Sequence, residues 1–435
     1  MRRLIPVILL LGAVHANDAL DVLEGKKNAS DVPLPPAAQE SEADHVSRES
    51  LVYIEPQWAP SPLDSVWSRA ILFEDTSNPW VQQMAVTGFF EWQAAYGDAE
   101  VDKVSPTPSK SVDLNSSLTR RARLGARIRA FRNTDIEANA EFAGNADYRG
   151  IERLSGRTEI APGDSVKYGK FRPGFTTEYS TEDACLPYPD RSMLVNMIAP
   201  SSTLGIMYNH RGPGWEYGMG WFSGDANPDL PGFEGNGFLS FNLSRTFVEP
   251  SGQSNMRTRW HLDYIHNLDG SRSESLSRYN IAGKASANGG QIATQNPAFH
   301  HMVSTGVVID QDDFSFTGDF MFAQGDASVW GLTLSPSYWV LPGTLKLVGR
   351  YHYADTNDAG ALVTTMGASA DPGFDDSPFF TGDEYHSFYI GANLHLYEDQ
   401  MVLMSGFEKI ILKDEAGGNF STEATMWHTG AKVSF

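Results

Sequence analysis

The chain has 435 residues and a formal net charge of −21 at pH 7, with 54 Asp and Glu against 33 Lys and Arg. This excess of negative charge argues against nucleic acid as a partner, because phosphate backbones bind basic surfaces. The chain contains one cysteine, so an internal disulfide cannot stabilise its fold.

The N-terminus carries the features of a secretory signal. Arg2 and Arg3 precede the apolar run 4–13, and Val14 and Ala16 occupy the two positions that a signal peptidase reads. The run is too short to span a bilayer as a helix, and no later run reaches the ~18 apolar residues of a transmembrane helix. We therefore expect a signal peptide at residues 1–16 and an exported mature chain.

Residues 17–79 are predicted to form an acidic N-terminal extension that is partly disordered. The stretch 17–50 is poor in aromatic residues and rich in Asp, Glu, Ser, Ala and Pro, a composition that cannot bury enough apolar surface to fold. Residues 51–79 add Trp58 and Trp67 between proline-rich turns. We expect this second part to pack at the mouth of the domain that follows.

From residue 80 onward, apolar and polar side chains alternate. In 386–396, for example, Phe388 and Leu394 alternate with Ser387 and His395. A period of two predicts strands with one apolar and one polar face. The expected strands are 82–97, 118–132, 135–146, 150–160, 165–173, 202–210, 214–223, 236–248, 257–267, 298–311, 313–324, 328–340, 343–355, 384–397, 400–413 and 422–435.

The lengths of the connections distinguish a membrane barrel from a soluble sandwich. Most connections after even-numbered strands are tight, as at Pro342-Gly343, whereas several after odd-numbered strands are long. Short turns at one end and long loops at the other are typical of outer-membrane barrels, with both termini on the periplasmic side. The long connections are 98–117, 174–201, 224–235, 268–297 and 356–383.

The fold prediction is therefore an all-β protein, a transmembrane antiparallel β-barrel of about 16 strands over residues 80–435. The expected location is the outer membrane of a Gram-negative-type bacterium, with lipid as a partner. Counts of 14 or 18 strands stay open. The end of the chain supports the prediction, because Phe435 closes a strand with an apolar face. A last strand that pairs with the first leaves no free edge, which lipid requires, and a terminal aromatic residue resembles the assembly signal of outer-membrane proteins.

One predicted strand, 118–132, carries a stripe of arginines. Alternation places four of them on one face and small or branched apolar residues on the other. The apolar face belongs against lipid, because an arginine in the middle of the hydrocarbon costs about 2–4 kcal/mol. The four guanidiniums must then line the lumen, where Arg153 and Arg157 of a nearby strand join them. The four arginines are Arg121, Arg123, Arg127 and Arg129.

Two interpretations of this stripe stay open. The arginines could form a ladder of fixed positive charge that attracts anions through a narrow lumen, since guanidinium stays charged and binds phosphate or carboxylate with two hydrogen bonds. Alternatively, they could belong to a solvated wall that neighbouring Glu and Asp neutralise. Glu137 and Glu141 lie on the strand between the basic ones, and we expect them to pair with some of these arginines.

A family resemblance appears in the same region. The run Arg120-Arg121-Ala122-Arg123-Leu124-Gly125, followed about 45 residues later by Gly169-Lys170-Phe171-Arg172-Pro173, resembles the phosphate-selective porins O and P. The similarity covers about residues 78–435. It implies a 16-stranded barrel, usually a homotrimer, whose third external loop, here 174–201, folds inward and narrows the pore. It also implies that Lys170, Arg172 and Arg191 lie near the constriction.

The third loop departs from the family pattern. Members that bind phosphate place several basic residues at the constriction, whereas 174–201 contains only Arg191. The same loop holds four acidic residues. A general or weakly anion-preferring porin therefore fits as well as a phosphate-selective one. The acidic residues are Glu178, Glu182, Asp183 and Asp190.

Enzymatic and metal-binding motifs give little support to another class. The sequence contains no Gly-x-Ser-x-Gly and no His-Glu-x-x-His. Cys185 has no histidine at a catalytic spacing and is interpreted as a small buried residue. The acidic loop 355–384 could bind calcium or could simply be solvated. We expect no enzymatic activity, no cofactor and no metal site.

The predicted function is that of an outer-membrane porin for passive diffusion of small hydrophilic solutes, leaning toward phosphate or other small anions. The alternatives are a general non-selective porin, an outer-membrane enzyme, or an anchor barrel that holds partners through residues 17–79. Small anions or other small solutes are the expected partners. The predicted anion pathway consists of Arg121, Arg123, Arg127, Arg129, Arg153, Arg157, Lys170, Arg172 and Arg191.

Overall fold

The computed structural model describes residues 63–103, 110–143, 147–225, 227–233, 236–248, 256–268, 276, 284–285, 292–293, 298–367, 379–415 and 420–435. The chain divides into two units, residues 1–47 and 48–435, and every described residue belongs to the second unit. The expected signal peptide and residues 17–62 of the expected extension lie outside the described residues.

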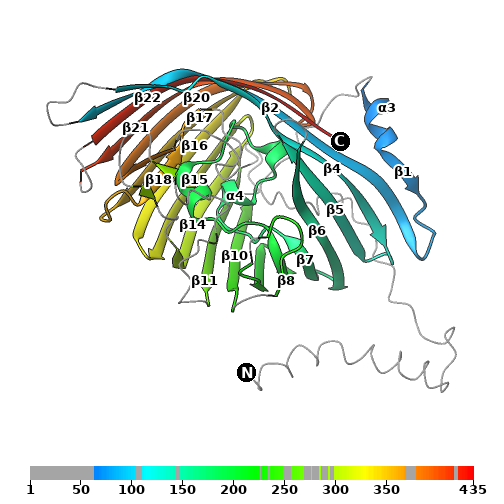
Figure 1. Ribbon diagram of the computed structural model, residues 1–435. Coiled ribbons are helices and arrows are strands. Elements are labelled where there is room, and N and C mark those ends of the chain that lie inside the picture. The colour runs from blue at the N-terminus through cyan, green and yellow to red at the C-terminus, as the bar shows by residue number, and fades with distance from the viewer. Residues whose placement is uncertain are drawn as a thin grey trace. The chain divides into compact units, whose positions relative to one another are not determined.

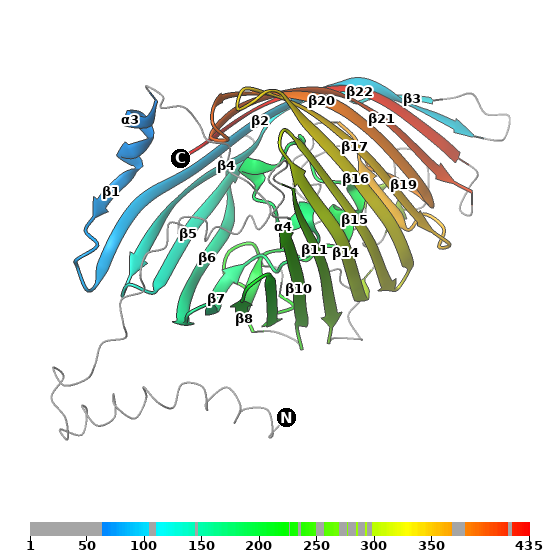
Figure 2. The same ribbon diagram turned by 180° about the vertical axis from the view of Figure 1, so that it is seen from behind.

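Sixteen long antiparallel strands close into a barrel (Figures 1 and 2). Each strand pairs with the next, and the last pairs with the first over a register that runs from Phe89↔Ser434 to Lys103↔Phe420. The strands are β2 (Val81–Lys103), β4 (Ser116–Ala130), β5 (Thr134–Ala143), β6 (Asp147–Ala161), β7 (Asp164–Phe171), β8 (Thr203–Arg211), β9 (Trp215–Phe222), β10 (Phe238–Val248), β11 (Arg257–Asn267), β14 (Phe299–Gln311), β15 (Phe314–Gly325), β16 (Ser328–Leu341), β17 (Leu345–Thr356), β20 (Glu384–Tyr397), β21 (Met401–Asp414) and β22 (Phe420–Ser434).

The predicted barrel of 16 strands is confirmed, and each expected strand coincides with an observed one. The largest difference is at β2, which continues to Lys103 rather than ending at residue 97. The continuation has a physical cause, because β22 and the short β3 (Lys110–Asp113) both pair with this part of β2 and satisfy its backbone groups.

Several short elements were not predicted. β1 (Ile71–Glu74) pairs with the start of β2, and two small hairpins lie in long connections. Among the described residues, no helix has the length and hydropathy needed to cross a membrane. The remaining short elements are β12 (Lys284–Ala285), β13 (Ile292–Ala293), β18 (Leu362–Thr365), β19 (Phe379–Gly382), α3 (Asp64–Trp67), η3 (Ser68–Ala70), α4 (Thr177–Ser180), η4 (Asp183–Cys185) and α5 (Met193–Ile198).

The barrel wall has an apolar outer face and a polar inner face. Phe90, Leu124 and Ile390 are large apolar side chains that stay exposed, at 44%, 56% and 70%. Glu91, next to Phe90, is fully buried, and so is Lys432, which lies opposite it in the register. An apolar exterior around a closed, edge-free sheet is what lipid requires. The chain therefore has the fold of an outer-membrane β-barrel.

The connection between β7 and β8, residues 172–202, folds into the barrel; we refer to it as loop 3. In both ribbon views its helix α4 lies inside the ring of strands (Figures 1 and 2). The apolar side chains of α5, among them Leu194 and Met197, are buried in one cluster with the wall residues Met321 and Val329. Burying a side chain of this size contributes about 1.5–3 kcal/mol. This confirms the inward-folded third loop, and it shows that apolar packing holds one side of it.

The described part of the expected extension packs on the end of the barrel that carries the C-terminus. The indole of Trp67 donates to the carbonyl oxygen of Ser434 at 2.6 Å, and the hydroxyl of Tyr397 donates to Asp64 at 2.7 Å. The rings of Trp67 and Tyr397 lie 4.7 Å apart. The segment α3–β1 therefore holds the final strand at this end of the barrel. By the rule that short turns are periplasmic, this is the periplasmic end.

The seam between first and last strands gives a testable prediction. A Cβ added at Gly97 of β2 would overlap the backbone carbonyl of Thr425 on β22, which cannot rotate aside as a side chain can, so Gly97→Ala should destabilise closure by about 1–3 kcal/mol through overpacking. We expect a smaller fraction of compact, heat-modifiable barrel on unheated SDS gels. Gly349→Ala is the matched control, because its Cβ has ordinary contacts, the nearest at 3.5 Å. Equal folding of the two variants would contradict the prediction.

Candidate functional site in the barrel lumen

Each of the four acidic side chains of loop 3 forms an ion pair with arginine. Three of the four carboxylates each pair with an arginine of the barrel wall, on β4, β6 or β17. The fourth carboxylate, that of Asp183, is shared by several guanidiniums. Ion pairs thus hold the polar part of loop 3, whereas apolar packing holds α5. The first three pairs are Glu178–Arg350 at 2.9 Å, Glu182–Arg153 at 2.8 Å and Asp190–Arg120 at 2.5 Å.

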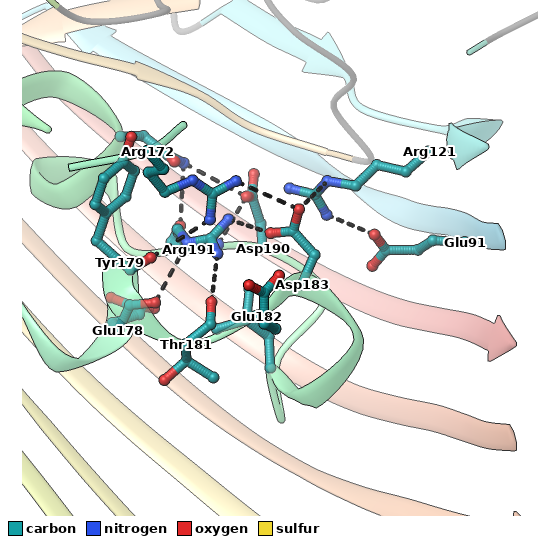
Figure 3. A network of polar contacts seen from close by, with 12 residues as sticks. Glu91, Arg121, Arg172, Glu178, Tyr179, Thr181, Glu182, Asp183, Asp190 and Arg191 are labelled. Atoms are coloured by element: carbon teal, nitrogen blue, oxygen red, sulfur yellow. Dashed lines mark hydrogen bonds and ion pairs between the residues drawn. The ribbon is translucent and has the colours of Figure 1, made fainter. Parts of the chain in front are cut away.

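Asp183 is the centre of this network (Figure 3). Its carboxylate is 1% exposed and lies within ion-pair distance of four guanidiniums. One oxygen is 2.5 Å from Arg191, and the other is 2.5 Å from Arg123, 3.4 Å from Arg121 and 3.6 Å from Arg172. A buried carboxylate is stable only with such partners.

The protonation of Asp183 follows from these contacts. Burial raises the pKa of its carboxyl group, but Arg121, Arg191, Arg123 and Arg172 outweigh burial and hold that pKa well below its usual value. The pKa of the neighbouring Glu182 is also lowered, because Arg153 and Arg172 together outweigh its burial. Both side chains therefore carry a negative charge at neutral pH.

The same arginines also bind carboxylates of the wall. Arg121 lies 2.5 Å from Glu91, Arg123 pairs with Glu141, and Arg172 lies 3.1 Å from Glu152. Four guanidiniums, those of Arg121, Arg123, Arg172 and Arg191, thus face four carboxylates. The expectation that Glu141 pairs with one of the arginines is confirmed, and Glu137 likewise lies 2.9 Å from Arg153.

A lysine fixes the tip of loop 3. The ammonium of Lys432 donates to the carbonyl oxygens of Asp183 and Leu186 at 3.0 and 2.8 Å, and it lies 3.7 Å from Glu91. Tyr188 donates to the carbonyl oxygen of Gly349 on β17 at 2.9 Å, and burial raises the pKa of Tyr188 to about 12. The tip is therefore tied to both β22 and β17.

A second polar cluster holds α4 against β11 and β15. Asp319 accepts from the backbone N–H and the hydroxyl of Thr177 at 3.1 and 3.0 Å. The ring of His261 lies between two carboxylates, 2.7 Å from Asp319 and 2.9 Å from Asp263. Asp263 also accepts from the backbone of Thr176 at 2.9 Å. We call this set the α4 clamp.

The clamp supports a strained backbone. Thr176 has φ of +53°, a conformation that is costly for a β-branched residue. Its hydroxyl caps α4 by accepting from the N–H of Tyr179 at 3.0 Å, while its own N–H is bound by Asp263. The surrounding hydrogen bonds thus offset a local backbone cost and fix where loop 3 enters the lumen.

The structure brings five of the predicted pathway residues together at loop 3: Arg121, Arg123, Arg153, Arg172 and Arg191. Three others lie toward the periplasmic end. Arg127 and Arg129 share the carboxylate of Asp135 at 3.7 and 3.5 Å, with 33% and 42% of their side chains exposed. Arg157 donates to the hydroxyl of Ser165 at 3.2 Å.

Lys170 lies elsewhere. Lys167 faces the lumen, because it pairs in register with Arg157, and Lys170 falls on the opposite face of β7 beside the outward-facing Leu154. Its ammonium donates to the carbonyl oxygens of residues 227, 228 and 229 at 3.2, 2.6 and 3.1 Å. Its contacts are with the connection between β9 and β10 rather than with loop 3.

Further lumen arginines were missed by the sequence analysis. Arg211, Arg257 and Arg259 share the inward face with Asn209 and His261. Arg157 lies within electrostatic range of Arg127 and Arg211, and Arg259 of Arg211 and Arg257. Alternation on β8 and β11 could have identified them. We call Arg127, Arg129, Arg157, Arg211, Arg257 and Arg259 the periplasmic arginine group.

Arg350, Lys432, His261 and Asp319 were missed for another reason. Alternation places each of them on the inner face of its strand, so their direction was predictable from the sequence. Their role was not, because each contacts a segment of loop 3 that is more than 80 residues distant along the chain.

A cavity separates loop 3 from β20, β21 and β22. It is narrow, and Thr364 and Thr365 of β18 are among its lining residues. Its walls carry charges of both signs as well as aromatic and amide groups. The charged and aromatic side chains include Asp190, Arg191, Arg350, Tyr389, Glu408 and His428.

Two smaller expectations can be compared with the structure. Cys185, the last residue of η4 in loop 3, is half-buried rather than buried. The described residues contain no group of three or more His, Cys, Asp or Glu arranged to hold a metal ion. Much of the acidic loop 355–384, which could bind calcium, lies outside the described residues.

No protein-family model matches the chain, and no curated protein matches it in sequence. Solved structures do match. OprB of Pseudomonas putida is 11% identical over 81% of this chain and 94% of its own, with a TM-score of 0.50. The outer-membrane channel DcaP of Acinetobacter baumannii is 12% identical over 83% and 99%, with a TM-score of 0.48. An anion-selective porin of Comamonas acidovorans is 12% identical over 81% and 99%, with a TM-score of 0.47. The likeness to OprB shows a shared barrel fold.

The α4 clamp gives a testable prediction. Asp319→Ala should leave the buried N–H of Thr177 without its acceptor and should leave His261 with one carboxylate, that of Asp263, instead of two; an unsatisfied buried polar group costs about 1–3 kcal/mol. Loop 3 should then open more often, and Cys185 should react about threefold faster or more with a small neutral thiol reagent.

The matched control for this change is Asp355→Ala. Asp355 is also a β-strand aspartate, but it accepts from the hydroxyl of Tyr353, which is part of the outer face. We expect its thiol reactivity to equal that of the wild type. A slow, unchanged reaction in Asp319→Ala would mean that the clamp does not restrain loop 3.

Proposed function

We propose that this chain is an outer-membrane channel for passive diffusion of small hydrophilic solutes. The observation that carries the proposal is a closed ring of 16 strands with an apolar exterior, around a charged lumen into which loop 3 folds. A barrel of this size encloses water-filled space, and an inward loop sets its narrowest point. The proposed location is the outer membrane of a Gram-negative-type bacterium.

We infer further that the channel prefers anions weakly. Around loop 3 the guanidiniums of Arg121, Arg123, Arg172 and Arg191 are balanced by carboxylates. In the periplasmic arginine group, Arg211 lies 2.9 Å from Glu216, but Arg127 and Arg129 share the one carboxylate of Asp135. Guanidinium stays charged at any physiological pH and can grip carboxylate or phosphate with two hydrogen bonds. The weak anion preference is therefore assigned to the periplasmic arginine group, in which two guanidiniums share a single carboxylate.

The proposed solutes are small anions, phosphate among them, together with other small hydrophilic molecules. The balanced charges at loop 3 support weak preference rather than a phosphate filter, because a filter needs unpaired donors at the narrowest point. Within the predicted pathway, Arg127, Arg129 and Arg157 then contribute most. Lys170 contributes least, since three backbone carbonyls occupy its ammonium.

The resemblance to the phosphate-selective porins supports one more element of the proposal, a homotrimer in lipid. In such a trimer, part of the apolar outer face of each barrel, with exposed residues such as Phe407 and Ile390, would contact the neighbouring copies, and the rest would contact lipid. Chemical crosslinking of the purified protein in detergent would report the number of copies.

The proposal predicts chloride preference in a planar bilayer under a potassium chloride gradient. The variant Arg127→Ala/Arg129→Ala removes two positive charges that share one counter-ion, so its chloride-to-potassium permeability ratio should fall about threefold to tenfold. The reversal potential measures this ratio directly.

Arg245→Ala is the matched control for an arginine outside the lumen. Arg245 is exposed on β10, and its guanidinium lies over the rings of Trp215 and Phe247 at 4.6 and 4.8 Å. Its reversal potential should equal that of the wild type. Cation preference in the wild type would rule out the anion-leaning channel, and the absence of current from folded protein would rule out the channel itself.

A further inference from the structure

The four arginines around loop 3 share one carboxylate that belongs to the loop rather than to the wall. Glu91 and Glu141 belong to the wall strands β2 and β5 and pair with Arg121 and Arg123 respectively. Asp183 is different, because it belongs to loop 3 and lies within 3.6 Å of four guanidiniums from β4 and from loop 3 itself. Its charge is therefore felt by the whole cluster.

The position of Asp183 matches the requirements of a masking charge. It is buried among the guanidiniums, so water and salt screen its interactions much less than they screen an exposed pair. The group is ionised, since the arginines hold its pKa well below the usual value. Without its charge, the four guanidiniums would share only the carboxylates of Glu91, Glu141 and Glu152. The ammonium of Lys432 already lies 3.7 Å from the first of these.

We propose that Asp183 is a selectivity-determining residue, which masks the arginine cluster and keeps the narrowest part of the lumen nearly neutral. This inference rests on the proposed channel function and deepens it. Loop 3, rather than the wall, then sets the anion preference at the constriction. Of the arginine stripe on β4, Arg121 and Arg123 are then masked by Asp183, whereas Arg127 and Arg129 lie outside its reach.

The critical variant is Asp183→Asn, which keeps the shape of the side chain and removes its charge. We expect the chloride-to-potassium permeability ratio to rise about threefold to tenfold, the effect of one unit charge in partly solvated surroundings. Asp183→Glu keeps the charge and should keep the wild-type ratio. Asp183→Asn/Arg191→Gln removes one charge of each sign and should return the ratio toward the wild type.

Cys185 supplies a second readout that does not depend on current. It lies two residues from Asp183 and is the only cysteine of the chain, so its reaction rates with an anionic and a cationic methanethiosulfonate of similar size report the local potential. Any change in thiolate fraction affects both reagents equally and cancels in the ratio. The anionic-to-cationic ratio should rise about threefold to tenfold in Asp183→Asn.

Glu423→Gln is the matched control for loss of one carboxylate. Glu423 is exposed on the outer face of β22, where it pairs with Lys409 at 2.6 Å. Both ratios should stay at their wild-type values. If both ratios stay unchanged in Asp183→Asn as well, the masking role is wrong. If Asp183→Glu shifts them as much as Asp183→Asn does, Asp183 acts through the shape of loop 3 rather than its charge, and the proposal is overturned.

The two readouts separate this inference from the proposed function. Wild-type protein that folds but carries no current would remove the channel function. The reagent ratio at Cys185 would then still decide whether Asp183 masks the arginines. Conductance with unchanged reagent and permeability ratios would leave the channel in place and remove the masking role.

Discussion

The organisation of the lumen depends on the ion pairs between acidic residues of loop 3 and arginines. Charged groups inside a barrel can be solvated by water or can pair with each other. Here the carboxylates of loop 3 pair with arginines of the wall and of the loop itself. Removing any one partner leaves a charge in surroundings where it is poorly solvated, which is why such pairs specify one arrangement of the loop. Asp183 is the most connected member of this set.

Loop 3 is held in two physically different ways. Toward β14–β17, α5 packs as the core of a soluble domain would, with Leu194 and Met197 fully buried. Charged contacts hold the rest of the loop, with Arg120 and Arg123 of β4, Arg153 of β6 and Arg350 of β17. Salt and pH weaken ion pairs by screening or protonation, whereas apolar packing carries no charge that either can neutralise. The apolar contacts of α5 therefore anchor the loop, and the ion pairs are the contacts that salt and solutes can weaken.

Much of the fold followed from local pattern. Alternation of side chains placed every long strand and also the direction of the arginine stripe, because a lipid-facing guanidinium is too costly. The length of the third connection, with its resemblance to known porins, placed loop 3 inside. Lys170 shows the limit of such reasoning, since its motif suggested the constriction while its strand parity turned it outward.

The partners across the lumen could not be predicted in this way. Arg350 and Glu178 are separated by 172 residues, and nothing local to either one indicates the other. Their contact depends on how far loop 3 reaches and on the curvature of the whole ring. The same holds for β1, whose four residues pair with β2 only because β22 ends before the start of β2.

The seam at which the barrel closes has a consequence for the order of folding. Trp67 and Ser434 are 367 positions apart, yet they are hydrogen-bonded, and β2 pairs with β22 along its length. Contacts of such sequence separation form late, because the intervening chain must first be ordered. The hairpins between neighbouring strands form from local contacts, whereas the seam needs both ends of the sheet at once. Until then, β2 and β22 are open edges, able to pair with any other strand. The segment α3–β1 contacts both strands of this seam, because β1 pairs with β2 and Trp67 is hydrogen-bonded to the end of β22. The same contacts that complete the barrel therefore also hold its two edge strands together.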